Sequence, residues 1–348
     1  MQPEWGFLPY DAACVQKCLY FNYGIYLSRA QNNIRKRREV IFKSHLINCK
    51  KETKMSTFNR LTDIFNSSIE IPFDDSSKFV LVSDCHRGDA GAIDNFIHNQ
   101  HIYFCALKHY YMNGYTYIDL GDSDELWKNK SFMNISNVYI EIFRLLHSFY
   151  EENRLHMIYG NHDIEKRDPE FVRKYMQSYY DNHKDEFEPL FERATFHEGI
   201  VLRNEETGTK LFLVHGHQGD FLDDTFWQLG RFLVRYFWRN MELFGFKDLT
   251  SAAKNNVKKR RVEKRITEWA VKNNQIVIAG HTHRPTCSPN KNTLYFNDGS
   301  CVHPSCISCI EIVNSEITLV KWYIRTRDDT SMCVQRQPIA VPRKIKSD

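Results

Sequence analysis

The chain has 348 residues, of which 42% are hydrophobic and 26% charged, with 47 Lys and Arg against 43 Asp and Glu. This is the composition of an ordinary globular protein, and it excludes a disordered or collagen-like chain. The mean hydropathy is −0.53, and no apolar run reaches the roughly 18 to 20 residues of a membrane span, which excludes an integral membrane protein. Residues 1–54 hold ten basic and four acidic side chains, so the net positive charge lies there and we predict no specific nucleic-acid binding.

The first thirty residues lack the basic segment followed by an apolar segment that marks a secretory signal. Ten cysteines in a chain without such a signal indicate reduced thiols rather than a disulfide framework. We therefore expect a cytoplasmic protein.

Residues 1–54 are rich in aromatic side chains but show no clear period, and we predict an N-terminal arm. Because Met55 stands shortly before the first convincing strand, the alternative is that translation starts there and the preceding segment is a miscalled extension. The predicted folded domain covers residues 55–324. Residues 325–348 are polar and contain two prolines, so we predict an irregular C-terminal tail.

From about residue 78, short apolar runs alternate with helical patterns over residues 96–107 and 138–149. This alternation favours an α/β core with crossover connections. The three later runs 294–296, 307–313 and 317–324 follow without a helix between them, as antiparallel strands would. Five earlier runs are short and rich in β-branched or aromatic residues, which predicts buried strands over residues 79–83, 115–120, 155–160, 211–215 and 275–280.

Polar side chains stand at the end of each of these five strands. In open α/β sheets ligands bind outside the carboxyl ends of the strands, so we expect the five clusters to converge. If the segment after the first strand is extended, Asp84 and His86 face the site while Cys85 points away. Glycines before three of the candidates allow sharp turns and close backbone approach. The clusters are Ser83-Asp84-Cys85-His86, Gly121-Asp122-Ser123-Asp124-Glu125, Gly160-Asn161-His162-Asp163, His215-Gly216-His217 and Gly280-His281-Thr282-His283.

Asp, Asn and His side chains are ligands for hard-to-borderline divalent metals, and no thiolate is required. A set of seven is too large for one tetrahedral zinc and fits two metal ions that share a carboxylate. Two such ions hold the attacking and leaving oxygens of a displacement at phosphorus. The candidate ligands are Asp84, His86, Asp122, Asn161, His215, His281 and His283.

The ordered motifs D-x-H, GD-x-x-E, GNHD, HG and GH-x-H over residues 78–312 resemble the calcineurin-like metallophosphoesterase superfamily. The resemblance implies an α/β fold, a four-layer αββα sandwich of two mixed sheets with a helical insertion. It also implies two divalent metal ions, with Mn²⁺ expected and Fe²⁺ or Zn²⁺ as alternatives. Asp84, His86 and His283 would bind the first ion. Asn161, His215 and His281 would bind the second, and Asp122 would bridge both.

The resemblance implies hydrolysis of a phosphomonoester or phosphodiester by a hydroxide that bridges the metals. His162 would protonate the leaving group or stabilise the transition state, and Glu125 would orient His162. The chain lacks the Asp-Arg-Gly of Ser/Thr protein phosphatases, which speaks against that branch. Some superfamily members are non-catalytic protein-binding scaffolds, and these lack the histidine that stands here at His162.

A second functional alternative comes from residues 125–127, Glu-Leu-Trp, and from a long insertion over residues 221–272. Both are similar to UDP-2,3-diacylglucosamine hydrolase, in which a helical insertion caps the site. This similarity favours a pyrophosphatase that acts on a nucleotide-lipid or nucleotide-sugar. The chain departs from that enzyme at His162, where the enzyme has Arg.

Within the insertion, arginines recur every four residues beside many aromatic residues. The pattern suits a phosphorylated amphiphilic substrate or peripheral contact with a membrane. The alternative is that the aromatic residues pack on the catalytic domain and the arginines are solvated. The basic run 254–265 also has two interpretations. It is either a surface that steers polyanionic substrates or simply an exposed helix face. The candidate substrate-binding residues are Arg231, Arg235 and Arg239, with Arg87 added because it follows His86 directly.

Overall fold

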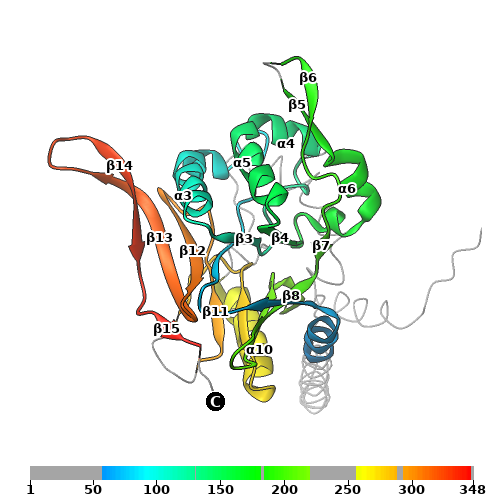
Figure 1. The fold of residues 1–348 in the computed structure, drawn as a ribbon, viewed down its shortest axis with the longest axis vertical. Helices are drawn as coiled ribbons and strands as arrows, with labels where there is room; N and C mark the ends of the chain where they lie inside the picture. Colours follow the sequence, from blue (N-terminus) through cyan, green and yellow to red (C-terminus); the bar gives the residue numbers. More distant parts are fainter. Residues whose placement is uncertain (1–56, 130, 182–183, 220–255, 288–292, 346–348) are drawn as a thin grey trace, which may run out of the picture. The chain divides into compact units, whose positions relative to one another are not determined.

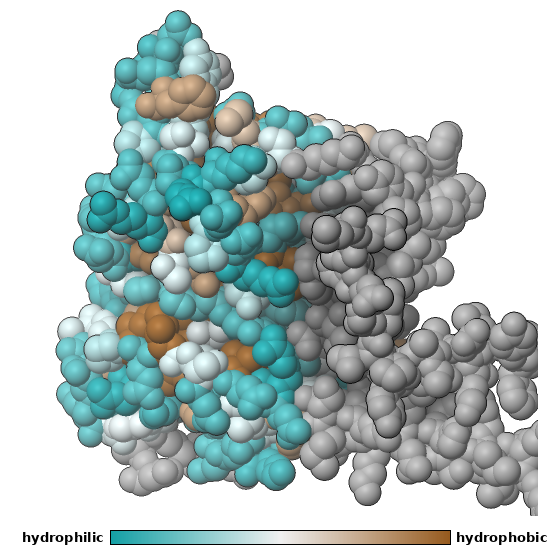
Figure 2. Space-filling model, turned by 90° about the vertical axis from the view of Figure 1, so that its right-hand side faces the viewer, coloured by the Kyte–Doolittle hydropathy of each residue, from teal (hydrophilic) through white to brown (hydrophobic). Residues whose placement is uncertain are grey.

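A computed structural model describes residues 57–129, 131–181, 184–219, 256–287 and 293–345 (Figure 1). The predicted N-terminal arm, residues 1–54, lies outside the described residues, and so do Arg231, Arg235 and Arg239. None of the helices in the described ranges is both long enough and apolar enough to cross a membrane. One face of the protein is mostly hydrophilic over its described residues, with hydrophobic residues in small separate patches (Figure 2).

The larger sheet has eight strands in the order β14-β13-β12-β2-β3-β4-β7, and β15 pairs with β13. Strands β2, β3, β4 and β7 are parallel, whereas β12 to β15 pair in antiparallel fashion. The predicted buried strands 79–83, 115–120 and 155–160 are therefore adjacent in one sheet. The strands are β2 (Lys78–Val82), β3 (Thr116–Asp119), β4 (Leu155–Ile158), β7 (Phe196–His197), β12 (Cys306–Val313), β13 (Glu316–Thr326), β14 (Met332–Pro338) and β15 (Arg343–Lys344).

The second sheet has five strands in the order β1-β8-β9-β10-β11. Only β8 and β9 pair in antiparallel fashion. The antiparallel arrangement expected for residues 294–296 is wrong, because β11 runs parallel to β10. The connection over residues 280–294 is long enough for the crossover that a parallel pair needs. The strands are β1 (Ile69–Phe73), β8 (Gly199–Asn204), β9 (Lys210–Val214), β10 (Ile276–Ala279) and β11 (Tyr295–Asn297).

Three hydrophobic clusters separate four layers. One cluster joins the large sheet to α3 (Gln100–Met112) and α5 (Ile140–Glu151). A second fills the space between the two sheets. A third joins the small sheet to a helix over residues 57–67 and to α10 (Asn256–Lys272). The predicted αββα sandwich of two mixed sheets is confirmed.

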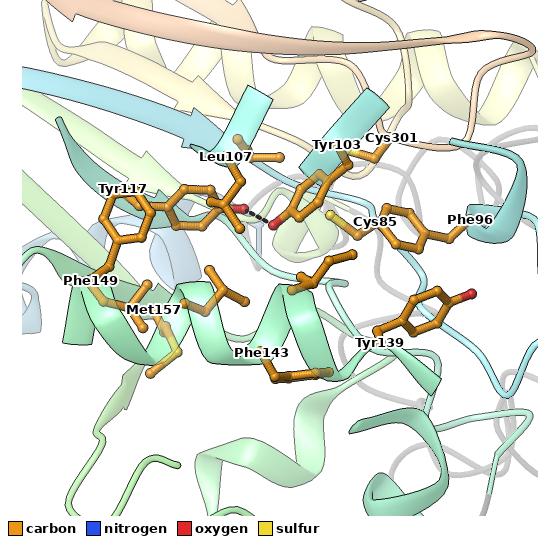
Figure 3. Close-up of a cluster of buried hydrophobic side chains, with 14 of the residues drawn as sticks. Cys85, Phe96, Tyr103, Leu107, Tyr117, Tyr139, Phe143, Phe149, Met157 and Cys301 are labelled. Atoms are coloured by element: carbon orange, nitrogen blue, oxygen red, sulfur yellow. Dashed lines mark hydrogen bonds between the residues drawn. The ribbon is translucent and has the colours of Figure 1, made fainter. Parts of the chain in front are cut away.

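The core behind the large sheet is rich in aromatic residues (Figure 3). The hydroxyl groups of Tyr103 and Tyr117 lie 2.7 Å apart, which satisfies both groups in an apolar environment. Cys85 is fully buried in the same cluster. The prediction that Cys85 points away from its neighbours Asp84 and His86 is therefore correct. Two short helices, α4 (Phe132–Val138) and α6 (Pro169–Tyr175), and a hairpin of β5 (Ser178–Asp181) and β6 (Glu186–Pro189) complete this side.

The last part of the predicted cap insertion, residues 256–272, packs on the small sheet. Residues 256–272 form α10, which belongs to the helix layer on the small sheet. The reason is the spacing of Val262, Ile266 and Trp269, which places these side chains on one buried face. Arg260 and Arg261 are exposed, as an exposed helix face predicts.

The irregular tail predicted for residues 325–348 is wrong. Strand β13 extends to Thr326, and β14 returns beside it as a hairpin. Arg336 of β14 also reaches β12, where its Nε atom donates to Glu311 Oε1 at 2.7 Å. Pro338 is the last residue of β14. This strand lies at the edge of the sheet, where a proline is tolerated.

Candidate metal centre

The seven candidate ligands come from loops that follow five strands of both sheets. Asp84 and His86 follow β2, Asp122 follows β3, and Asn161 follows β4. His215 follows β9 of the small sheet, and His281 and His283 follow β10. The side chains form two groups whose ligand atoms lie within 4.8 Å of one another: Asp84, His86 and His283, and Asp122, His215 and His281.

The backbone at these ligands is unlike the extended chain that the sequence predicts. The φ angles of Asp84, His86 and Asp122 are 51°, 48° and 54°, and those of His281 and His283 are 67° and 52°. Non-glycine residues rarely adopt the left-handed region, and such residues cluster at functional sites. The side chains of Asp84 and His86 therefore point to the same site because both residues have left-handed backbone angles, and not because they alternate along an extended strand.

The glycines before the ligands permit close backbone approach, as predicted. A Cβ atom at Gly160 would lie 2.1 Å from Asp122 Oδ1, and one at Gly280 would lie 2.2 Å from Ser83 Oγ. Neither distance is compatible with a side chain. These two glycines let the loops after β4 and β10 pack directly against the acidic ligands.

In the first group, ring nitrogens converge on one carboxylate oxygen. The Nε2 atoms of His283 and His86 lie 3.0 and 3.6 Å from Asp84 Oδ1 and 3.2 Å from each other. The Oδ1 atom is buried and accepts no hydrogen bond from a described residue. Three ligand atoms with lone pairs face one point, which fits a divalent cation.

In the second group, the tautomer of one ligand is set by the backbone. The Nδ1 atom of His215 lies 2.9 Å from the Leu120 carbonyl oxygen, so Nδ1 holds the hydrogen and donates it. In the neutral ring, the form that binds a metal ion, the lone pair is then on Nε2, which lies 3.2 Å from Asp122 Oδ2. A hydrogen bond of this kind is typical of metal-binding histidines.

Asn161 stands between Gly160 and His162, which both approach Asp122 closely, and the residue is 2% exposed. Its Oδ1 atom is buried and accepts no hydrogen bond from any residue in the described ranges. A buried acceptor without a donor is costly unless a cation fills its place. The donor set of both groups therefore fits divalent metal ions.

Charge inside the site supports the same conclusion. Burial raises the pKa of Asp84, but His283 and His86 outweigh burial and hold that pKa well below its usual range. Burial lowers the pKa of His215, but the Asp122 carboxylate outweighs burial and raises it to about 9. The carboxylates are thus ionised and attract positive charge, which protons supply on the histidines when no metal is bound.

His162 is held on two sides at the edge of the site. Its Nδ1 atom lies 2.9 Å from Glu125 Oε1, and its ring stacks on Trp127 with centroids 4.3 Å apart. Its backbone N–H donates to Asp122 Oδ1 at 2.7 Å. Burial lowers the pKa of His162, but Glu125 and Asp122 outweigh burial and raise it. The two predicted catalytic side chains are therefore in direct contact.

The Arg87 side chain is buried in the core, whereas a residue that binds substrate must be accessible. Its side chain is 2% exposed, its Nε atom donates to Asp124 Oδ1 at 2.8 Å, and its guanidinium lies over the Phe143 ring. The residue turns into the core because Asp124 supplies a buried counter-charge. The interpretation of Arg87 as a contact for substrate phosphate is thus not supported.

A buried ionic network of Asp163, Lys166 and Asp124 supports the loop that carries Asp122, and the sequence analysis did not predict it. The Asp163 carboxylate accepts the N–H of Gly160 at 2.7 Å and those of residues 122, 123 and 124 at 3.3, 3.2 and 3.4 Å. The ammonium group of Lys166 lies 2.7 Å from Asp163 and 2.6 Å from Asp124. The network holds the loop that carries Asp122. The signal was the final Asp of the GNHD motif.

Two cationic side chains next to the first group were also missed. Glu263 on α10 accepts from Thr282 Oγ1 at 3.0 Å and from Arg284 Nη1 at 2.9 Å, on either side of His283. Lys259 stands one helical turn before Glu263 and is 9% exposed. Burial and the charge of Arg284 lower the pKa of Lys259, against smaller opposing effects of Glu263 and Asp84. Lys259 belongs to the basic run 254–265, but only the fold shows that it is buried while Arg260 and Arg261 of the same run are exposed.

Comparison with known proteins assigns the family. The sequence model described as the calcineurin-like phosphoesterase superfamily domain matches residues 133–313. A comparison with curated protein sequences gave no significant match. Among solved structures, Vacuolar Protein Sorting 29 from Cryptosporidium parvum is 14% identical, with a TM-score of 0.35 over 77% of this chain and 100% of that chain. Vps29 from Chaetomium thermophilum is 10% identical, with a TM-score of 0.36 over 77% of this chain and 99% of that chain.

The match to the superfamily domain covers more than half of the chain and includes the loops after β4, β9 and β10. This chain belongs to the calcineurin-like phosphoesterase superfamily.

Proposed function

We propose that this protein is a metal-dependent phosphoesterase that binds two divalent metal ions and hydrolyses a phosphomonoester or a phosphodiester. The observation that carries the proposal is the position of Asp122 between the two groups of ligands. Its Oδ2 atom lies 3.2 Å from His215 Nε2 and 3.9 Å from His86 Nε2. One carboxylate beside both groups suits a pair of ions that share a ligand.

When bound, the metal ions supply Lewis acidity, which activates water and neutralises charge on the phosphoryl oxygens. Mn²⁺ is the expected ion, with Fe²⁺ or Zn²⁺ as alternatives, because the donor set accepts all three. Asp84, His86 and His283 hold the first ion in this proposal. Asn161, His215 and His281 hold the second.

His162 acts as the proton donor to the leaving group or as a hydrogen-bond donor to a phosphoryl oxygen. Glu125 fixes the ring through Nδ1 and stabilises the imidazolium form. Trp127 covers one face of the ring. This pairing also argues against the non-catalytic scaffold, since a scaffold has no use for an oriented proton donor.

A pyrophosphatase that acts on a nucleotide-lipid or nucleotide-sugar is the second candidate. The observation in its favour is the pair of cations, Lys259 and Arg284, beside the first group of ligands. Two cations suit a second phosphate next to the one that is attacked. Hydrolysis of detergent-dispersed nucleotide-lipids against soluble nucleotides discriminates between the two candidates.

The test is hydrolysis of an aryl phosphomonoester and an aryl phosphodiester by protein that was stripped with a chelator and reloaded with Mn²⁺. We expect activity that requires the metal and about two ions per chain by elemental analysis. Asp122→Ala should abolish most activity with every ester, and His162→Ala should do so for esters whose leaving group has a high pKa. His101→Ala is the matched control, because His101 is exposed on α3. Activity that is unchanged in Asp122→Ala would refute the proposal.

A further inference from the structure

The loop after β10 carries two candidate ligands on a strained backbone. His281 and His283 have φ angles of 67° and 52°, in the left-handed region that residues other than glycine rarely adopt. Such a backbone persists only where the surrounding structure holds it in place. Contacts that fix this loop therefore also fix the direction of the two histidine side chains.

The residues on either side of His283 are held by one carboxylate from another element. The Oε1 atom of Glu263 on α10 accepts from Thr282 Oγ1 at 3.0 Å, and its Oε2 atom accepts from Arg284 Nη1 at 2.9 Å. Thr282 is fully buried, and the side chain of Glu263 is 15% exposed. Glu263 thus uses both oxygens to fix the chain directly before and directly after a candidate ligand.

The helix that carries Glu263 is itself packed on the small sheet. Val262 and Ile266 are 2% and 0% exposed in the cluster that joins α10 to this sheet. A Cβ atom at Gly219 would lie 2.9 Å from Val262 Cγ1, so the helix also lies close against the loop after β9. A supporting side chain on a packed helix holds its partners more precisely than one on a loop. The Glu263 carboxylate therefore has a fixed position relative to the sheet.

We propose that Glu263 is a positioning residue that holds residues 282–284 so that His283 Nε2 faces the first metal ion. The inference rests on the proposed function for the ion, whereas the two hydrogen bonds hold the loop with or without a metal. Glu263 belongs to neither group of candidate ligands. His283 Nε2 lies 3.0 Å from Asp84 Oδ1, so a shift of the loop would separate two ligand atoms of the first ion.

The effect of Glu263 should be confined to the first ion. His281, the ligand of the second ion on the same loop, has its own support, because its N–H donates to Asp84 Oδ2 at 2.7 Å. His215 and Asn161 come from the loops after β9 and β4. Loss of Glu263 should therefore weaken one of two binding events and not both.

The test compares Glu263→Ala with Glu263→Gln by calorimetric titration of the metal-free protein with Mn²⁺. Glu263→Ala should weaken one site about 10- to 100-fold, as loss of support behind a metal ligand does, and leave the other near its wild-type affinity. The amide of Glu263→Gln can accept from Arg284 and donate to Thr282 Oγ1, so this variant should recover most of the affinity. Glu170→Ala is the matched control, because Glu170 forms an exposed ion pair with Arg173 on α6. Wild-type affinity at both sites in Glu263→Ala, or no recovery in Glu263→Gln, would overturn the proposal.

A second measurement needs no metal and so separates this inference from the proposed function. In metal-free protein, amide hydrogen exchange over residues 280–286 should be about tenfold faster in Glu263→Ala than in the wild type, as loss of a hydrogen bond predicts. Residues of β3 should exchange at the same rate in both proteins. A wild type that binds no Mn²⁺ would refute the proposed function, whereas the exchange rates test the hold of Glu263 on the loop independently. Equal exchange over residues 280–286 in the two proteins would refute the inference even if the protein hydrolyses phosphoesters.

Discussion

The Nδ1 atom of His162 lies 2.9 Å from Glu125 Oε1, and the same carboxyl group places Oε2 3.6 Å from His86 Nδ1. One carboxylate thus links the proposed proton donor to a candidate metal ligand. A ring fixed in this way stays oriented through the reaction, and its charged form is stabilised.

Glu125→Gln should move the basic limb of the pH–rate profile to lower pH. Glu125 raises the pKa of His162 against the effect of burial, so a neutral amide lowers that pKa. Protonated His162, and with it the activity, is then lost at a lower pH than in the wild type. The profile of kcat/KM against pH measures this shift. An unchanged basic limb would show that His162 is not the titrating group.

His162→Ala should lower kcat by about 10²- to 10⁴-fold, the usual contribution of a general acid. Metal content should stay at the wild-type value, since His162 is not among the predicted ligands. A leaving group of low pKa needs no proton, so an aryl ester with such a leaving group should lose much less. Equal losses with good and poor leaving groups would contradict proton donation.

Metal-free protein should lose stability as pH rises from about 6.5 to about 9. Asp122 raises the pKa of His215 from 6.5 to about 9. The ion pair between them therefore stabilises the fold fully below about pH 6.5, and this stabilisation is lost above about pH 9. Added Mn²⁺ should restore stability in this range, by about 2.7 kcal/mol at a hundredfold excess over Kd. Thermal unfolding with and without Mn²⁺ measures both effects. His215→Gln should reduce this pH dependence without removing it, because the pKa values of His86 and His162 are also raised.

Lys166→Met should destabilise the fold by about 3 to 5 kcal/mol, because it leaves buried carboxylates without a counter-ion. Lys166 is 2% exposed and bridges Asp124 and Asp163. Denaturant unfolding measures the loss. Lys174→Met is the matched control, since Lys174 is exposed on α6 and should change stability little. A similar result for both variants would contradict the role of the network.

Lys259→Met should raise KM about tenfold with a smaller change in kcat, as loss of one charge-assisted contact to an anionic substrate predicts. Lys259 interacts with Asp84 and Arg284 beside the first group of ligands. Lys264 lies on the same helix and is exposed, so Lys264→Met is the control. An unchanged KM for every phosphoester tested would exclude Lys259 from substrate binding.

The prediction of the strands that carry the ligands was correct for β2, β3, β4, β9 and β10, because each is a short apolar run with polar residues at its end. Strand β1 was missed, since it is an edge strand with Pro72 and its Ile69 is 39% exposed. Strand β13 was predicted over residues 317–324, but β14, which pairs with it, was missed because its residues are mostly polar.

Residue types at the ends of the predicted strands were sufficient to predict the seven candidate ligands, because type and spacing are properties of the sequence itself. The resemblance that the ordered motifs carry predicted the family and the layered fold. The tertiary structure alone decided that Arg87 is buried with Asp124, that Lys259 is buried near the charge of Arg284, and that Asp298 lies against Ser83. Each of these depends on a contact between segments far apart in sequence, and burial and charge at such contacts exist only after the two sheets have packed together.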